Sequence, residues 1–383
     1  MTIPTTDSLY VKKEEPDLPL DSIRAKEEER LYDLSRKISP NPRVTKRRRS
    51  KYRPLNGTVL DISNIPLHPK TLSDCLQLED VGFLCQSLET SKKIVAITGA
   101  GISVASGIPD FRSANGLFQG FASKTNGSGK NLFDYNVFRS PESLKEFEKM
   151  IRKLYTLSVE CEPSPFHRLL DRISQDGRLL RLYTQNIDCL DTQLPHLETR
   201  VPLTFQKPYP RTIQLHGNIK LLNCSKCHHV KELDESYFNE NSMLIRDCPE
   251  CEELNAVRAV AGRRVQSGGV LRPRIVLYNE FHPDGEIIGN ITESDLKTRP
   301  DCLLVVGTTL KIPGVRRLVK EMAKVVHSKN GSVIWINIEE PTQSIVDYVE
   351  HFDLIVTGSC QEIPVLLDAF HDLKSKKKQS KKI

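Results

Sequence analysis

Short apolar runs alternate with amphipathic segments along the chain from about residue 72 onward. The runs are rich in β-branched residues and cover 93–98, 179–184, 274–278, 302–306, 332–338 and 352–356. Runs that are apolar on both faces are typical of parallel strands covered by helices on both sides. Segments with helical spacing lie between them, at about 73–91, 142–158, 164–175, 314–328 and 361–371. The alternation predicts an α/β fold with a Rossmann-like, doubly wound parallel sheet.

Glycine-rich or polar segments follow four of these runs directly. The segment GAGISVASGIPDFRS begins at Gly99, QNID begins at Gln185, GTTL begins at Gly307, and Glu339 follows the run 332–338. Sheets of this kind bind their ligands beyond the carboxyl ends of the strands. The sequence therefore predicts a functional site at this edge of the sheet.

Two regions interrupt the alternation and are expected to form a second, smaller lobe. The first, at about 113–163, is helical in pattern and contains the Gly- and Asn-rich stretch 125–131. The second, at about 221–264, contains two pairs of cysteines. We expect the two insertions to stand together over the edge of the sheet, with the site in the cleft between the lobes.

The paired cysteines predict a structural zinc ion. Each pair has two intervening residues, the arrangement in which one tight turn presents two thiolates, and together they supply four ligands: Cys224, Cys227, Cys248 and Cys251. Four soft thiolates are the usual closed, non-catalytic zinc site. Redox-active thiols are the alternative. A zinc ribbon can mark a nucleic-acid-binding module, but the acidic stretch between the pairs argues against contact with DNA there.

The charge of the 383-residue chain is unevenly distributed. The formal net charge is +6, yet residues 43–53 and 374–383 hold seven and six Lys or Arg and no acid, which leaves the body between them acidic. Such polar runs are expected to be disordered. The first reads as a nuclear address or a phosphate contact, with a merely solubilising tail as the alternative. Because no apolar run approaches about 18 residues, we expect a soluble intracellular protein without a membrane span.

The glycine-rich loop departs from that of an ordinary dehydrogenase. Gly99 and Gly101 allow a tight turn that brings backbone amides close to a phosphate, and a following helix would favour the anion. However, Val104 occupies the position of the third glycine, and no acidic residue stands at 119–124, where the ribose-binding carboxylate is expected. The consecutive carboxylate, aromatic ring and guanidinium of residues 110–112 are chemistry that a simple turn does not need.

These motifs, in this order, resemble those of the sirtuins, the NAD-dependent protein lysine deacylases. The resemblance rests on GAGISVASGIPDFRS, TQNID at 184–188, LHG at 215–217, the four cysteines, GTTL and INIE at 336–339, and it covers roughly residues 75–371. It implies a catalytic domain over 72–371, preceded by a disordered extension (1–71) and followed by a basic tail (372–383). Within that domain it implies a Rossmann-like lobe at about 72–112, 164–220 and 265–371, a helical insertion at 113–163 and a zinc module at 221–264.

The resemblance also implies the reaction and its residues. NAD is consumed to give nicotinamide, O-acetyl-ADP-ribose and deacetylated lysine. His216 would be the general base, since a neutral imidazole suits that role at pH 7, and Asn186 and Asp188 would line the nicotinamide end and complete the catalytic set. The implied cofactor contacts are Ala100, Gly101, Ile102, Ser103, Val104, Asp110, Phe111, Arg112, Gln185, Asn186, Ile187, Asp188, His216, Gly307, Thr308, Thr309, Asn337, Ile338, Glu339 and Cys360.

For the protein substrate, the resemblance implies that an extended peptide is held between two strands. The implied contacts are Val276, Tyr278, Asn279, Glu280, Pro313 and Gly314. Here the sequence departs from the family, because Asn279 stands where the family has glycine. Asparagine tolerates the left-handed backbone region better than most residues do, so the departure bears on peptide specificity rather than on catalysis.

The long polar extension and the basic cluster resemble the fungal nuclear branch, which acts on the globular-core lysine of histone H3 at position fifty-six. This implies an acetylated histone or another nuclear protein as partner, contact with nucleic acid or nuclear import through the basic tails, location in the nucleus, and roles in silencing and genome stability. Two alternatives stay open: mono-ADP-ribosyl transfer to protein, and a non-catalytic chromatin scaffold.

Overall fold

The structure is a computed structural model of the chain, and it describes residues 52–63, 65, 78–110, 129–238 and 245–379. The chain divides into two units, Met1–Arg49 and Ser50–Ile383, and the described residues all lie in the second. No helix in these described ranges is long and apolar enough to cross a membrane.

A seven-stranded parallel sheet forms the larger lobe; the sequence predicts its parallel, doubly wound type and five of its strands, but not β1 or β4. Its order is β1-β11-β10-β9-β2-β3-β4, and every neighbouring pair is parallel. The strands are β1 (Thr58–Asp61), β2 (Ile94–Thr98), β3 (Leu179–Thr184), β4 (Thr212–Gln214), β9 (Cys302–Val306), β10 (Ser332–Asn337) and β11 (Leu354–Thr357). The chain runs outward from β2 in both directions, so the strand order changes direction at β2, where a doubly wound sheet binds its ligand.

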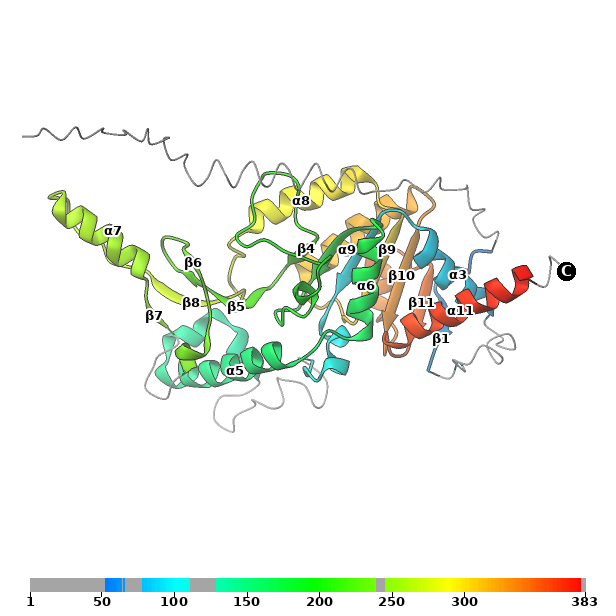
Figure 1. The fold of residues 1–383 in the computed structure, drawn as a ribbon, viewed down its shortest axis with the longest axis horizontal. Helices are drawn as coiled ribbons and strands as arrows, with labels where there is room; N and C mark the ends of the chain where they lie inside the picture. The colour runs from blue at the N-terminus through cyan, green and yellow to red at the C-terminus, as the bar shows by residue number, and fades with distance from the viewer. Residues whose placement is uncertain (1–51, 64, 66–77, 111–128, 239–244, 380–383) are drawn as a thin grey trace, which may run out of the picture. The chain divides into compact units, whose positions relative to one another are not determined.

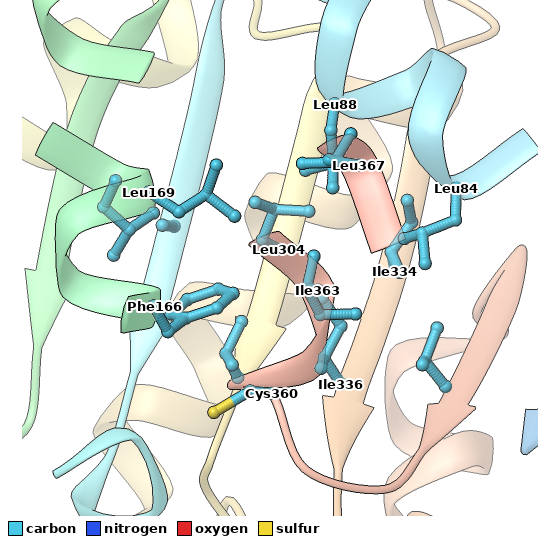
Figure 2. Close-up of a cluster of buried hydrophobic side chains, with 14 of the residues drawn as sticks. Leu84, Leu88, Phe166, Leu169, Leu304, Ile334, Ile336, Cys360, Ile363 and Leu367 are labelled. Carbon is cyan, nitrogen blue, oxygen red and sulfur yellow. The ribbon is translucent and has the colours of Figure 1, made fainter. Parts of the chain in front are cut away.

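Helices cover both faces of this sheet, because successive strand residues point to opposite sides (Figure 1). Leu304 and Ile334 face α3 (Leu78–Thr90), α6 (Pro165–Gln175) and α11 (Glu362–Gln379), as Figure 2 shows. Val305 and Trp335 face the opposite core, with α8 (Gly285–Thr298), α9 (Pro313–His327) and α10 (Gln343–Val349). Two separate apolar cores therefore fix the strands that carry the candidate site.

The smaller lobe combines the helical and the cysteine-bearing insertion. A four-stranded sheet has the order β6-β5-β8-β7, with β5 (Gly217–Cys224), β6 (Val230–Glu232), β7 (Arg246–Asp247) and β8 (Val270–Ile275). The remaining elements are the helices α5 (Pro141–Glu160) and α7 (Pro249–Val260) and the 3₁₀ turns η3 (Gly129–Phe133), η4 (Tyr135–Arg139) and η6 (Glu235–Phe238). Phe147 and Met150 of α5 share one buried core with Leu222 and Cys224 of β5, so the two insertions pack as one lobe.

Helix starts follow local chemistry. The Ser140 hydroxyl caps α5 and Pro141 occupies the first position, where its missing N–H is no loss. The same pattern recurs in α6 with Ser164 and Pro165.

The structure corrects one predicted strand. The run 274–278 was expected among the parallel strands, but β8 ends at Ile275 and pairs antiparallel with β5 in the small sheet. Its residues Leu271 and Ile275 are buried in the core of the small lobe. The cysteine-bearing module consequently extends beyond 221–264 at both ends. An apolar run indicates that a strand is buried, but it does not indicate to which sheet the strand belongs.

The predicted limits of the terminal segments also change. Residues 58–61, assigned to a disordered extension over 1–71, form β1 at the edge of the large sheet. Helix α11 continues to Gln379, past the expected start of a tail at 372, because a lysine-rich run is a good helix former once an apolar first half is docked. Residues 43–51 of the basic cluster at 43–53, and residues 380–383, lie outside the described residues.

Candidate active site and metal centre

The glycine-rich segment after β2 packs tightly against the segment after β9. A Cβ atom at Gly101 would lie 2.7 Å from Gly307 Cα, and one at Gly99 would lie 2.7 Å from Thr308 Cβ. The Gly101 amide donates to the Gly307 carbonyl at 2.9 Å. Both positions therefore require glycine. Because neither residue has a side chain, the groups that they place at the carboxyl edge of the sheet are backbone amides and carbonyls.

Within residues 99–110, the chain does not form the α-helix expected after this loop. The chain instead makes two short 3₁₀ turns, η1 (Ala100–Ile102) and η2 (Val104–Ser106), and Gly107 then adopts a left-handed conformation with φ of 93°. Residues 99–110 therefore supply no α-helix dipole to the loop. The backbone of the loop and its side chains remain as the groups that can meet a phosphate.

Ser103 joins the loop after β2 to the loop after β3. Asn186 Nδ2 donates to Ser103 Oγ at 3.1 Å, and Ser103 Oγ donates to Asp188 Oδ2 at 2.7 Å. The Leu190 amide donates to Asp188 Oδ1 at 3.0 Å. All three side chains are buried. Because both oxygens of Asp188 accept hydrogen bonds, this arrangement fits an ionised carboxylate.

The surroundings of Asp188 oppose that charge. Burial raises the pKa of Asp188, and the nearby Asp191 carboxyl raises it further, while His167, the Ser103 hydroxyl and the Leu190 amide lower it. Carboxyl groups shifted by burial and by a like charge are typical of functional sites.

His216 lies at the crossing between the two sheets, in the turn between β4 and β5. Its Nδ1 atom is 3.0 Å from the Gln185 carbonyl oxygen, and its own carbonyl accepts from the Val276 amide at 2.9 Å. A carbonyl can only accept, so Nδ1 carries the proton and Nε2 has the lone pair of the neutral ring. The next residue, Gly217, has φ of 93°, and a Cβ there would lie 2.1 Å from the Arg274 carbonyl oxygen.

The other strand ends supply the remaining predicted contacts along this edge. Gln185 Nε2 donates to Thr308 Oγ1 at 2.9 Å, and the Gly358 amide donates to the Asn337 carbonyl at 2.9 Å. The Trp335 indole N–H donates to the Glu339 carbonyl at 3.0 Å. The Cys360 thiol is buried and accepts from Gln361 Nε2 at 3.3 Å, and burial raises its pKa to about 12, so its backbone is the group left for a ligand.

Several buried oxygen atoms at this edge fit a bound nucleotide. Thr98 Oγ1, Ser106 Oγ and Asn186 Oδ1 have no hydrogen-bond partner among the described residues. Buried polar atoms are normally paired, and a polar co-substrate would satisfy them. Ala100 and Asp110 are in the same loop, and Ile338 is 70% exposed next to Glu339. Phe111 and Arg112 lie outside the described residues.

The four cysteines meet at one point, as the sequence predicts. Cys224 Sγ lies 3.7 Å from Cys251 Sγ, Cys227 Sγ lies 3.6 Å from Cys248 Sγ, and all four sulfur atoms are within 4.8 Å of one another. Sulfur atoms bound tetrahedrally at about 2.3 Å from zinc are about 3.8 Å apart. The amides of Lys226 and Cys227 both donate to Cys224 Sγ, which favours a thiolate. The donor set and its spacing fit a zinc ion.

The segment expected to hold a peptide is tied to the helical insertion. Asn279 adopts φ of 65°, the left-handed conformation expected for a family glycine, and its Nδ2 donates to Asp134 Oδ2 at 2.6 Å. The Tyr278 amide donates to the Phe133 carbonyl at 2.6 Å. Glu280 forms an ion pair with Arg272. Pro313 and Gly314 begin α9 and are exposed.

Two buried titratable residues beside this site were not predicted from the sequence. His167 on α6 and Asp191 at the start of η5 (Asp191–Gln193) are both at most 1% exposed. The signals were present: Ser164-Pro165 predicts a capped helix start with residue 167 facing inward, and Asp191 follows Asp188 by three residues. Both patterns are common in ordinary loops and helices, so neither stands out without the fold.

Comparison with known proteins gives a consistent result. The family model described as Sir2 family matches residues 99–314. The chain is 48% identical over 295 residues to the NAD-dependent histone deacetylase HST4 of Saccharomyces cerevisiae, covering 75% of this chain and 78% of that one. It is 46% identical over 314 residues to the NAD-dependent protein deacetylase hst4 of Schizosaccharomyces pombe, covering 80% and 74%. Among solved structures, the complex of a Sir2 homologue with NAD matches with a TM-score of 0.54 at 22% identity, covering 76% of this chain and 94% of that one.

Proposed function

The chain belongs to the Sir2 family and is an NAD-dependent protein deacetylase, and on this premise we propose that His216, Asn186 and Asp188 carry its chemistry. The observation that supports the assignment most directly is the hydrogen-bonded series from Asn186 through Ser103 to Asp188. Asn186 and Asp188 follow β3, and His216 follows the neighbouring strand β4. The Nδ1 atom of His216 is held by the carbonyl of Gln185, the residue before Asn186.

Each of these residues has a definite task. His216 takes up a proton at Nε2 from a hydroxyl in the cleft, because its Nδ1 is already protonated and held. Asp188 accepts a hydrogen bond from a carboxamide, and its fixed partners keep it in the acceptor state. Asn186 presents Oδ1, which has no partner among the described residues, to a donor on the co-substrate. Ser103 holds the other two in place.

Other residues at the strand ends would bind the rest of NAD. The backbone from Ala100 to Val104 and Gly307 to Thr309 fits the pyrophosphate and ribose, and Asn337 to Glu339 with the Cys360 backbone fits the adenosine end. When bound, NAD supplies a glycosidic bond to nicotinamide and a ribose that receives the acetyl group. Asp110, Phe111 and Arg112 remain a predicted loop over this site.

The four cysteines would hold one zinc ion with a structural role. All four ligand positions are filled by protein thiolates, so the site offers no open position for a substrate. Three of the four cysteines are buried within the core of the small lobe.

The substrate is proposed to be an acetylated histone. HST4 of S. cerevisiae carries the name histone deacetylase, which supports this class of substrate. An extended peptide would bind at Val276, Tyr278, Asn279 and Glu280 on one side and at Pro313 and Gly314 on the other. The finer proposals follow from the resemblance: the core lysine at position fifty-six of histone H3, a role in silencing and genome stability, and location in the nucleus through the basic segments at 43–53 and 374–383.

The test is nicotinamide release by the purified full-length protein with NAD and an acetylated histone H3 peptide. We expect release together with acetyl-ADP-ribose, and loss of both in His216→Tyr. Release no greater than that of the variant would overturn the enzyme assignment and favour the scaffold. Transfer of ADP-ribose to protein without deacetylation would favour the transferase alternative.

Substrate choice needs a separate comparison. We expect faster deacetylation of nucleosomes acetylated at the core lysine of histone H3 than of nucleosomes acetylated on a histone tail. Equal rates on both would contradict the finer proposal and leave the deacetylase activity untouched.

A further inference from the structure

Two buried residues behind the nicotinamide end of the site form a pair that the proposed chemistry does not use. His167 Nε2 lies 3.7 Å from Asp191 Oδ1, with side-chain exposures of 0% and 2%. Neither atom has a hydrogen-bond partner among the described residues. Because unpaired buried polar atoms are costly, their placement opposite each other requires an explanation.

Two groups of Ser164 contact His167 Nδ1: the hydroxyl oxygen, 2.8 Å away, can donate or accept, whereas the amide can only donate and therefore indicates the tautomer. The Ser164 amide donates to His167 Nδ1 at 3.1 Å, and an amide N–H can only donate. Nδ1 is therefore the acceptor, and Nε2 carries the proton of the neutral ring and faces Asp191. Burial lowers the pKa of His167 to about 4, so the ring is neutral near pH 7.

Asp191 has the opposite shift. Burial raises its pKa to about 7, against the lowering effect of a hydrogen bond from Thr184. The Thr184 hydroxyl also accepts from the Asn186 amide at 3.1 Å. The charge on Asp191 also raises the pKa of Asp188, so the two carboxyl groups share one electrostatic environment.

The two thiols that face this cluster stay protonated near pH 7. Burial and the neighbouring carboxylates raise the pKa of the Cys161 thiol, which follows α5, and burial and then Asp188 raise that of Cys189 to about 12. Arg168 on α6 pairs with Glu162 on the surface. Burial and Asp191 also raise the pKa of Asp188, so the two carboxyl groups titrate as a coupled pair, and Asp191 is the member that lies opposite His167.

We propose that His167 and Asp191 are positioning residues that form a buried proton-holding pair, whose charge tunes the binding of the cationic nicotinamide ring beside Asp188. This inference rests on the proposed function, which assigns Asp188 to the nicotinamide end. When Asp191 is protonated, Asp188 supplies the negative charge alone. When Asp191 is ionised, a second negative charge lies behind it and attracts the positive ring.

The sign of the linkage follows from this arrangement. A cationic ligand favours the ionised form of Asp191, so NAD binding near pH 7 releases protons, and affinity for NAD rises with pH through this range. The rise is on the order of tenfold, the change that one unit of pKa shift produces. ADP-ribose lacks the cationic ring and is expected to release none through this pair.

Calorimetric titration in two buffers of different ionisation enthalpy measures the released protons directly. We expect release when wild-type protein binds NAD at pH 7, little release with ADP-ribose, and little release when Asp191→Asn binds NAD. The matched control is Asp171→Asn. Asp171 lies on α6, the helix that carries His167, and its carboxylate pairs with His196 and is more exposed than that of Asp191. This variant should behave like wild type. His216 is common to all these proteins, so its titration cancels in the comparison.

The outcomes separate this inference from the proposed function. If wild-type protein neither bound NAD nor released nicotinamide, the proposed function itself would fail. If wild-type protein bound NAD and released nicotinamide, but Asp191→Asn released as many protons as wild type, the proposed role of the His167–Asp191 pair would be excluded. The proposed function would stand. A variant that fails to fold leaves a test on unliganded wild-type protein by NMR: a proton on Nε2 of His167 and an Asp191 midpoint near 7 support the pair, whereas a proton on Nδ1 or a midpoint below about 5 overturns it.

Discussion

Asn279 Nδ2 donates a 2.6 Å hydrogen bond to Asp134 Oδ2, and this contact joins the proposed peptide-binding segment to the helical insertion. A glycine, which the family has at this position, could adopt the same left-handed backbone but could not make the bond. The residue that departs from the family pattern therefore keeps the expected backbone and adds a tie between two parts of the small lobe.

Replacing Asn279 separates these two contributions. Asn279→Gly keeps the backbone conformation and loses the bond, and we expect the KM for an acetylated peptide to rise a few-fold, in keeping with about 1 kcal/mol for a hydrogen bond. Asn279→Ala adds left-handed strain of about 1–2 kcal/mol and should raise it further. Steady-state kinetics with varied peptide at saturating NAD measures both. Equal KM values for the two variants and wild type would show that this segment does not contact peptide.

Ser103→Ala should impair the chemistry more than binding of the protein substrate. The change leaves the buried side chains of Asn186 and Asp188 without their shared partner, at a cost of about 1–3 kcal/mol, so nicotinamide release should fall roughly 10- to 100-fold. Single-turnover nicotinamide release is the measurement. Ser158→Ala, a buried serine whose hydroxyl donates to the Tyr155 carbonyl outside the site, is the control and should retain activity.

Gly269→Ala should disrupt the metal centre without altering any ligand. A Cβ there would lie 2.4 Å from Cys224 Sγ and 2.9 Å from Lys226 Cβ, whereas a Cβ at Gly268 would lie 3.8 Å from its nearest neighbour, Cys251. We expect lower zinc content and a lower Tm for Gly269→Ala and wild-type values for Gly268→Ala. Metal analysis of the purified proteins decides, and full zinc occupancy in Gly269→Ala would contradict the proposed geometry.

The beginning of the catalytic unit can be tested at Arg53. Its guanidinium pairs with the buried Asp353 at 2.7 Å and donates to the Gly331 carbonyl at 2.5 Å. Removal of residues 1–49 should leave stability unchanged, whereas Arg53→Ala should cost about 1–2 kcal/mol, discounted because Arg53 is partly exposed. Urea unfolding of both proteins measures the difference. A large loss on removing 1–49 would show that the unit begins earlier.

The same ion pair predicts a pH dependence of stability. Burial raises the pKa of Asp353, but His327, the Val333 amide and Arg53 lower it by more, so the net pKa is below its usual value. A carboxyl shifted downward stabilises the fold above its unfolded pKa of about 4, and that contribution is lost as pH falls through the folded value. We expect the stability difference between wild type and Arg53→Ala to shrink below about pH 4 in urea titrations. A constant difference across this range would exclude the linkage.

The alternation of apolar runs and helical segments predicted most strands of the parallel sheet. Features that depend on a particular tertiary contact were not predicted. Five of the six apolar runs form strands of the parallel sheet, because burial on both faces leaves a strong pattern. The strand at 58–61 escaped notice because it is four residues long and its burial is uneven. The run at 274–278 is as apolar as the others, and only the fold reveals that its partner is β5.

The candidate site shows the same limit. Motif order brought out the residues around Asn186 and His216, which lie at the strand ends where the chain topology places them. The Ser103 bridge, the Asn279 tie and the pair behind Asp188 depend on side chains far apart in sequence. No spacing rule predicts them, because each needs two loops to be placed within hydrogen-bond distance.

The buried core shared by the two insertions also contains Ile187 and Cys189, the residues on either side of Asp188. Cys224, Cys248 and Cys251 belong to the same core. A zinc ion held there would take no part in the reaction. Its loss would nevertheless loosen the packed core that supports the loop carrying Asp188. The zinc content of a preparation should therefore report the fraction of molecules able to turn over, which makes metal analysis a measure of active enzyme.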